Sequence, residues 1–175
     1  MWSIRCMLNT FVVLPFSTAV GLYLWPMRRD FEAQYQWNAV WVSIFIIKIL
    51  IFVLFYDIVF YSLHRLLHAI PFLYRNVHHH HHHARLNGDA FHASVFEHIF
   101  INVWPFIIVC HYVGFTYTMF TLWGLLALAN TTYTHTKART NHYLHHRRRD
   151  NGDFVNFGVG FMFCDKISGT FVAAE

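Results

Sequence analysis

The sequence predicts an all-α integral membrane protein with four transmembrane helices and a cytosolic, helical, His-rich cap. Of its 175 residues, 56% are apolar and only 13% are charged, and the mean hydropathy is +0.34. A soluble domain carries about 25% charged residues, so this composition indicates a membrane protein. Long uncharged segments supply the predicted helices, and most of the 15 histidines, gathered in a few motifs, supply the cap.

Two apolar segments in the first part of the chain are long enough to cross the roughly 30 Å hydrocarbon core as helices. The first extends from Met7 to Met27, with a cleaved signal peptide as the alternative interpretation. The second extends from Ala39 to about Tyr61 and contains Lys48 and Asp57. Charges inside a membrane cost roughly 2.5–3.5 kcal/mol each on insertion scales, so they usually face protein or a polar site.

The uncharged stretch from Ile99 to Thr136 is too long for one span and long enough for two short antiparallel spans. The His111–Gly114 stretch is the natural turn between them. Residues 1–38 are therefore predicted to hold the first span and a short loop, and residues 39–175 to form one domain. Four spans place both termini and both His-rich regions on the same side of the membrane.

Basic residues around the His-rich regions indicate that this side is the cytosol. They are Arg65, Arg75, Arg85, Lys137, Arg139, Arg147, Arg148, Arg149 and Lys166. Arg28 and Arg29 in the opposite loop oppose this orientation, although the positive-inside bias tolerates exceptions.

Three His motifs follow one another along the chain. His64 and His68 form HxxxH, which places both rings on one helix face, about one turn apart. A run of six histidines follows, in which His78, His81 and His82 satisfy HxxHH on one face. The shifted register of His79, His82 and His83 fits equally well by spacing alone.

The third motif is TNHYLHH, where His142, His145 and His146 repeat HxxHH outside any homopolymer. His135, at the end of the fourth predicted span, brings one more imidazole to the same membrane surface. A single zinc needs three or four ligands, whereas these motifs supply about nine, so two metal ions are predicted. The three cysteines form no CxxC pair, which excludes a cysteine zinc site, and imidazole alone does not select the metal.

Asp57 begins a helical stripe that continues through Tyr61, His64 and His68. We predict that Asp57 and Tyr61 lie beside the metal-binding imidazoles, with Asp57 accepting a hydrogen bond from one of them or pairing with a cation. A helix-end aspartate in the headgroup region is the alternative. His92, His98 and His111 stand outside the motifs and are expected to make polar contacts.

These motifs, in this order, resemble the fatty acid hydroxylase/sterol desaturase superfamily of integral-membrane di-iron enzymes. The resemblance runs from about Asp57 to Phe171 and includes HRLLH, RNVHHHHHH, the uncharged hairpin and NHYLHH. The family's interval between its first two motifs favours His78, His81 and His82. Its remaining motif positions are matched by Asp57, Tyr61, His64, Arg65, Asn156, Gly158, Asp165, Gly169 and Thr170, with Phe157 and Cys164 where Tyr and Trp are usual.

The resemblance implies a cytosolic cap that holds two iron ions among the histidines and uses O2 as co-substrate. The expected reaction is hydroxylation or desaturation of a lipid, either a sterol, a sphingolipid or a fatty acyl chain. Without a haem or flavin motif, electrons must come from an external donor, a small cytochrome or a reductase. In a eukaryote the expected location is the endoplasmic reticulum membrane. Nothing near Arg147–Arg149 stacks bases, so no nucleic-acid partner is expected.

The His motifs also fit two other classes of function. A His-rich divalent-metal transporter or metal-buffering membrane protein is the first alternative. Transporters place ionisable ligands at the bilayer midplane, whereas these histidines lie at or beyond the ends of the spans, which favours the enzyme. The second alternative is a relative without catalytic activity that binds lipid, which the intact His motifs disfavour.

Overall fold

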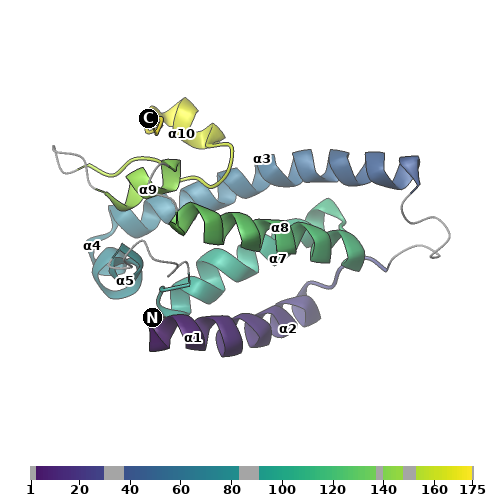
Figure 1. Ribbon diagram of the computed structural model, residues 1–175, viewed down its shortest axis with the longest axis horizontal. Helices are drawn as coiled ribbons and strands as arrows, with labels where there is room; N and C mark the ends of the chain where they lie inside the picture. The colour runs from purple at the N-terminus through teal and green to yellow at the C-terminus, as the bar shows by residue number, and fades with distance from the viewer. Residues whose placement is uncertain (1–2, 30–37, 83–90, 137–139, 148–152, 175) are drawn as a thin grey trace.

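The regular elements of the computed structural model are all helical within the residues that it describes. It describes residues 3–29, 38–82, 91–136, 140–147 and 153–174. Figure 1 shows the long helices α2, α3, α7 and α8 packed side by side, with the short helices α4, α5 and α9 gathered at one end. The prediction of an all-α fold is confirmed for the described residues, and the order of the elements is the predicted one.

The first long helix combines three elements: α1 (Ile4–Leu8), the π-helical turn η1 (Asn9–Val13) and α2 (Leu14–Leu24). Ser3 caps it by accepting a hydrogen bond from the Cys6 N–H at 3.1 Å. The wide π-helical turn precedes Pro15, whose ring would clash with a carbonyl in a tighter ladder. The helix ends before Pro26, which disfavours helical backbone at Trp25. It therefore begins and ends three residues earlier than the predicted Met7–Met27 span.

Helix α3 (Ala39–Ala69) contains the second predicted span and continues beyond it. It begins where Asn38 accepts a hydrogen bond from the Trp41 N–H at 2.8 Å and ends before Pro71. Its 31 residues reach about 46 Å at about 1.5 Å per residue, which exceeds the roughly 30 Å hydrocarbon core. Helix α3 is therefore longer than a membrane span requires, and its C-terminal part carries the HxxxH histidines.

A short helical segment after α3 carries the His run. It consists of α4 (Pro71–Leu73), the π-helical turn η3 (Tyr74–His78) and α5 (His79–His82). His78 closes the π-helical turn and the next four histidines continue as α-helix, so the run is helical through His82. His83, which belongs to the shifted register, lies outside the described residues.

The uncharged stretch forms the predicted hairpin. Its first arm is α6 (Val95–Glu97), η4 (His98–Val103) and α7 (Trp104–Val113), and its second arm is α8 (Tyr117–Thr136). Gly114 ends the first arm in the left-handed region, at φ 78°, where glycine has no steric penalty. The Phe115 N–H donates to the Cys110 carbonyl at 2.9 Å and completes this cap. The turn thus comprises residues 114–116, so it begins at the last residue of the predicted His111–Gly114 stretch, whose first three residues are still helical.

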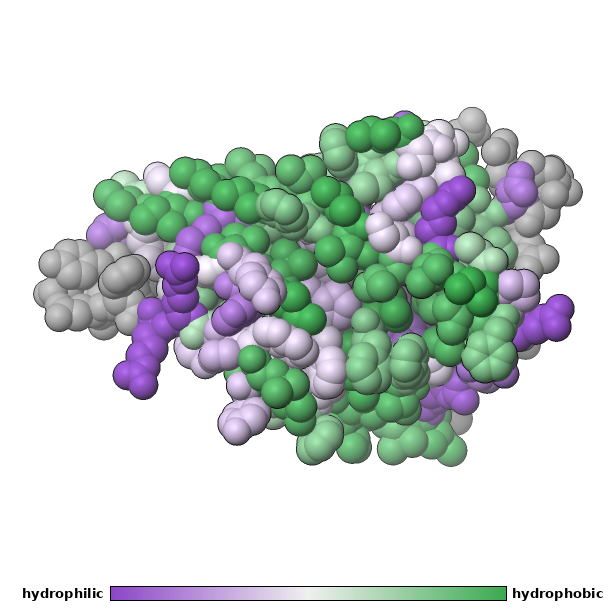
Figure 2. All heavy atoms as spheres, turned by 180° about the vertical axis from the view of Figure 1, so that it is seen from behind, coloured by the Kyte–Doolittle hydropathy of each residue, from purple (hydrophilic) through white to green (hydrophobic). Residues whose placement is uncertain are grey.

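Three of these helices are long and apolar enough to cross a membrane: Ile4–Leu24, Ala39–Ala69 and Val95–Val113. Their outward faces carry exposed apolar side chains such as Phe16, Ile46 and Phe55. Figure 2 shows apolar residues over most of one face of the molecule. A surface of this kind is typical of a protein whose solvent is lipid. Helix α8 is less apolar because Asn130 and several threonines occupy its second half.

Close packing of α2 on α7 organises the bundle core. At Gly21 of α2, an added Cβ would lie 2.6 Å from the Ile107 Cδ1 atom of α7. Small residues of this kind let apolar helices approach closely. The buried core joins residues from α3, from the first arm of the hairpin, from α8 and from the connecting segments: Met27, Trp41, Phe52, Val103, Ile107, Val109, Cys110, Phe115 and Met119.

The C-terminal part of the chain contains α9 (Asn141–His146) and α10 (Phe163–Ser168). Thr140 caps α9 by accepting a hydrogen bond from the Tyr143 N–H at 3.2 Å. Asn156, at φ 57°, binds this helix to the last residues, because its Nδ2 donates to the carbonyls of Asn141 and Val172. The segment after α9 therefore returns across the end of α3, where Figure 1 shows α10 above it.

Candidate metal centre

Nine histidines gather at one end of the bundle in two groups. The first group is His64, His68, His78, His82 and His145, and the second is His81, His135, His142 and His146. Within each group, one nitrogen of every ring lies within 4.8 Å of the others. These are the nine histidines singled out from the sequence. Of the two registers that the sequence left open, His78, His81 and His82 all belong to the groups, whereas His79 belongs to neither.

Four helical segments deliver these rings to one place. The end of α3 carries the HxxxH pair, the His run carries three rings on η3 and α5, α8 carries His135, and α9 carries the last three. His78 and His82 point into the first group, while His81, between them in sequence, belongs to the second group. The run therefore contributes to both groups from one short helix.

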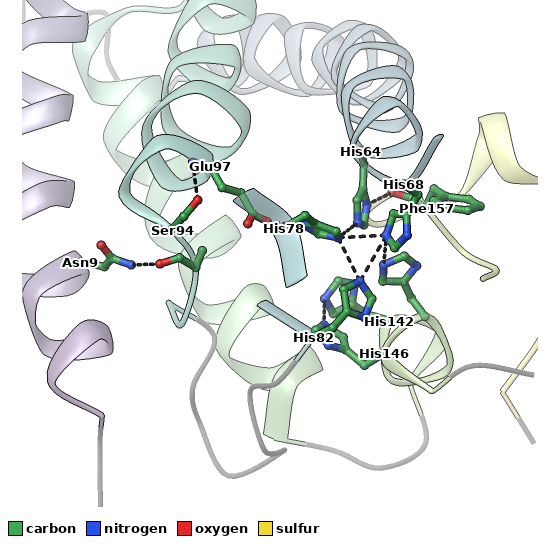
Figure 3. A network of polar contacts seen from close by, with 12 residues as sticks. Asn9, His64, His68, His78, His82, Ser94, Glu97, His142, His146 and Phe157 are labelled. Carbon is green, nitrogen blue, oxygen red and sulfur yellow. Dashed lines mark hydrogen bonds and ion pairs between the residues drawn. The ribbon is translucent and has the colours of Figure 1, made fainter. Parts of the chain in front are cut away.

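The Nε2 atoms of the first group face one another (Figure 3). His78 Nε2 lies 3.0 Å from His64 Nε2 and 2.9 Å from His68 Nε2. His82 Nε2 lies 3.0 Å from His78 Nε2, and His145 Nε2 lies 3.3 Å from His68 Nε2. The five ring nitrogens thus enclose a single point of convergence.

The opposite ring nitrogens fix the tautomers. His64 Nδ1 lies 2.6 Å from the Phe157 carbonyl oxygen and His145 Nδ1 lies 2.8 Å from the Val155 carbonyl oxygen. A carbonyl can only accept, so both Nδ1 atoms carry the proton and both Nε2 atoms carry a lone pair. His78 follows the same pattern, because its Nδ1 lies 2.7 Å from Glu97 Oε1.

Converging lone pairs require a cation between them. Two unprotonated nitrogens about 3 Å apart cannot hydrogen-bond to each other and repel. Metal–nitrogen bonds of about 2.0–2.1 Å, the values for zinc–imidazole ligation, place neighbouring ligand atoms about 3.0–3.4 Å apart. The measured separations from His78 to His64 and His82, both 3.0 Å, fall at that value. The donor set therefore fits a bound metal ion.

The second group has the same construction. His135 Nδ1 lies 2.8 Å from the Thr131 carbonyl oxygen, so its Nε2 also presents a lone pair. That Nε2 lies 3.0 Å from His142 Nε2, which in turn lies 3.1 Å from His146 Nε2. The His81 ring centre is 4.5 Å from that of His146. The ring centres of His82 and His146 are 4.9 Å apart, so the two groups are neighbours.

Burial keeps these rings neutral. It lowers the pKa of His78, His81, His142 and His145 below the ordinary histidine value, and the neighbouring histidines lower it further. Burial, followed by the charges of nearby histidines, lowers the pKa of His146 to about 3. Neutral imidazole is the form that binds metal, so the rings are in their ligating state at neutral pH.

Asp57 and Tyr61 lie behind the first group, against the C-terminal segment. Asp57 is 1% exposed, and its Oδ2 accepts a hydrogen bond from the Cys164 N–H at 2.8 Å. The structure thus gives Asp57 a backbone N–H as partner where an imidazole or a cation was predicted. Seven residues, about 10 Å along a helix, separate it from His64, which is too far for direct contact. Tyr61 Oη lies 3.5 Å from Thr170 Oγ1.

Asp165 supports the carbonyl that orients His64. Its carboxylate accepts hydrogen bonds from the N–H groups of Phe157 at 2.8 Å and Gly158 at 2.6 Å, and from Thr170 Oγ1 at 2.7 Å. Gly158 is required here because an added Cβ would lie 2.8 Å from Asp165 Oδ2. Asp165 was noted in the sequence through the family motif, but its action on His64 through a backbone carbonyl was not predicted.

Glu97 is the acidic residue of the site that the sequence reasoning missed. The signal for it was its position, since a carboxylate at the start of an apolar span needs a buried partner. Of the remaining histidines, His92 Nδ1 lies 2.8 Å from Ser3 Oγ and His111 Nδ1 lies 2.7 Å from the Pro26 carbonyl oxygen. His98 is buried beside the Phe91 ring. None of these three belongs to either group.

Comparison with known proteins identifies the family of this chain. The family model described as fatty acid hydroxylase matches residues 49–170. Fatty acid hydroxylase domain-containing protein 2 from Macaca fascicularis is 32% identical over 141 residues, which cover 76% of this chain and 40% of the relative. The human protein of the same name gives the same values. This chain thus spans 40% of the length of these relatives, and no solved structure matches it. On this evidence the chain belongs to the fatty acid hydroxylase family, within the fatty acid hydroxylase/sterol desaturase superfamily.

Proposed function

We propose that this chain is a membrane-bound, di-iron, O2-dependent oxidoreductase that hydroxylates or desaturates a lipid. Family membership supplies the class, a lipid-acting oxidative enzyme. The observation that carries the finer proposal is the pair of imidazole groups, in which His64, His145 and His135 are each held through Nδ1 by a carbonyl. In each of these rings the lone pair is therefore on Nε2, and it points at the other rings of its own group before any metal binds.

The two groups would hold one iron ion each. His64, His68, His78, His82 and His145 would hold the first, and His81, His135, His142 and His146 the second. Bound iron supplies the redox chemistry by which O2 oxidises an unactivated C–H bond. Asp57 and Tyr61 would support the first group indirectly, through the C-terminal segment that they contact. The proposed substrate is a sterol, a sphingolipid or a fatty acyl chain, and lipid profiling distinguishes the three.

The side chains around the centre limit the access of water. Phe154 covers the first group, with ring centres 4.2 Å from His68 and 4.9 Å from His82. Phe60, Leu67 and Ile101 form a buried apolar cluster, and the Phe60 ring centre lies 5.4 Å from that of His64. Apolar side chains of this kind exclude water from the centre. Electrons would come from a separate small cytochrome or reductase.

The proposed membrane arrangement adds a fourth span to the three candidate spans. We infer that α8 crosses as the fourth span and that the His groups face the cytosol, in the endoplasmic reticulum membrane if the organism is eukaryotic. The position of the centre supports the enzyme over the alternative metal transporter. His64 and His68 belong to the last six residues of a 31-residue helix, and α5 and α9 lie outside the long helices. A transporter would place such ligands near the bilayer midplane.

Lipid profiling tests this proposal. Cells expressing the chain are compared with cells expressing His145→Ala, which removes a fully buried ring of the first group. We expect an oxidised sterol, ceramide or fatty acid in the first culture and its loss in the second. His79→Ala is the matched control, because it removes a ring of the same run that belongs to neither group. Identical lipids in the wild-type and His145→Ala cultures would contradict the proposed activity.

A further inference from the structure

The Glu97 carboxylate, carried by α6, contacts His78 of the first group. Its Oε1 accepts a hydrogen bond from His78 Nδ1 at 2.7 Å, and the two side chains are 4% and 1% exposed (Figure 3). His64 and His145, by contrast, donate to uncharged backbone carbonyls. Within the described residues, the second group makes no contact with a carboxylate. The two groups therefore differ in their surroundings.

The local sequence directs Glu97 toward His78. Ser94 begins the helix, and its Oγ accepts a hydrogen bond from the Glu97 N–H at 3.2 Å. In the usual Ser-x-x-Glu capping box the glutamate side chain returns to the first N–H of the helix. Here Ser94 forms its half of the box, while the Glu97 carboxylate binds His78. The side chain has thus left its ordinary local partner for a partner 19 residues away.

The first long helix holds this segment in place. Asn9 is fully buried, and its Nδ2 donates to the carbonyls of Phe91 at 2.7 Å and Ala93 at 3.0 Å. Ala93 directly precedes Ser94, so Asn9 fixes the start of the helix that carries Glu97. Figure 3 shows the line of contacts from Asn9 through Ser94 and Glu97 to His78.

We propose that Glu97 is a positioning residue that makes the two metal groups unequal, so that the first group retains its metal ion more tightly than the second. This inference rests on the proposed function, since it concerns the same two groups. A carboxylate that accepts the Nδ1–H makes an imidazole a stronger donor at Nε2, and its negative charge offsets that of the cation. Losing such a partner typically weakens metal affinity about 10–100-fold.

Metal titration of the purified chain tests this inference without relying on activity. Full-length protein in detergent is stripped of metal and dialysed anaerobically against graded Fe²⁺, and bound iron per chain is measured. We expect two irons on the wild type and, for Glu97→Gln, one iron bound as before and the other about 10–100-fold more weakly. Gln keeps the shape of Glu and can still accept from Nδ1, but it removes the charge. Asp153→Asn, which neutralises an exposed carboxylate, should leave both affinities unchanged.

A double variant separates positioning from a structural role. If Glu97 acts through His78, adding Glu97→Gln to His78→Ala should cause no further loss of iron. An additional loss, two wild-type affinities in Glu97→Gln, or equal weakening of both irons would overturn the inference. If Glu97→Gln is not recovered as folded protein, Glu97→Asp replaces it: its shorter side chain withdraws the carboxylate from His78 Nδ1, and the same one-site loss of iron affinity is expected. A wild-type chain that binds no iron would instead overturn the proposed function.

Discussion

At the residue scale, the two ring nitrogens have separate roles in four of the nine histidines, which are His64, His78, His135 and His145. Nε2 faces the other histidines, whereas Nδ1 donates to a group that cannot itself donate, such as the carbonyls of Val155, Phe157 and Thr131. The backbone thereby selects one tautomer and one ring orientation before metal arrives. Neighbours within one His run are not equivalent, because His78 and His82 direct a ring nitrogen into the first group, His81 directs one into the second, and His79 belongs to neither.

The first prediction concerns the His run. His78→Ala and His81→Ala should each lower the iron bound per chain, because each removes an Nε2 atom from one of the two groups. His79→Ala and His80→Ala should leave two irons per chain, since neither ring belongs to a group. The measurement is metal analysis of protein purified anaerobically in detergent.

A control protects this comparison from differences in folding. All four variants should elute from size-exclusion chromatography at the volume of the wild type, because the long helices do not depend on the run. Equal losses of iron in all four variants would mean that the run acts as a flexible polyhistidine segment, in contrast to the helix seen through His82.

At the element scale, hydrophobic pattern predicted the long helices well and their ends less well. The first helix is displaced by three residues because Ser3 supplies a cap ahead of the apolar run and Pro26 supplies a stop inside it. The hairpin turn was predictable since Gly114 is the flexible residue between two apolar segments. The registers of the His run were not separable from spacing, because any six consecutive histidines satisfy HxxHH more than once.

The second prediction tests how α2 packs on α7. Gly21→Ala should destabilise the bundle by about 1–3 kcal/mol, because its Cβ would lie 2.6 Å from Ile107 Cδ1 in a packed core. Adding Ile107→Val removes that Cδ1 atom and should restore part of the loss. Thermal unfolding in detergent measures both effects.

Gly124 of α8 offers a matched control for this pair. No atom lies within 4 Å of an added Cβ at Gly124, so Gly124→Ala should be neutral or raise stability by up to about 1 kcal/mol through helix propensity. A Gly21→Ala variant as stable as Gly124→Ala would show that α2 and α7 do not pack closely at this point.

At the scale of the whole molecule, the centre lies where segments far apart in sequence converge. His64 contacts His78, 14 residues away, and the carbonyl of Phe157, 93 residues away. The sequence could identify the nine histidines, since ligand spacing is local within each motif. It could not divide them into two groups, nor find the link from Glu97 to His78, because those contacts depend on how α3, η3, α5, α6, α8 and α9 pack together.

The third prediction follows from this convergence. Chelation should loosen the cap and leave the bundle intact, because the lone pairs that converge in each group repel once the cation is removed. Bound metal stabilises the folded state by about 2.7 kcal/mol per site at a concentration 100-fold above Kd. This stabilisation acts where the metal ligands lie, at the end of α3 and on α5, α8 and α9. The packing of α2 on α7 near Gly21 does not depend on metal.

Hydrogen exchange with and without chelator measures the difference segment by segment. Amide protection in residues 140–147 and 153–174 should fall by about 10- to 100-fold after chelation, in line with the metal-linked free energy, while protection in α2 and α7 should change little. Both segments depend on the centre, since α9 carries three of its rings and the carbonyls of Val155 and Phe157 hold His145 and His64. A uniform fall across all helices would instead show that the metal stabilises the whole fold, and no change anywhere would show that the cap is held by its protein contacts alone.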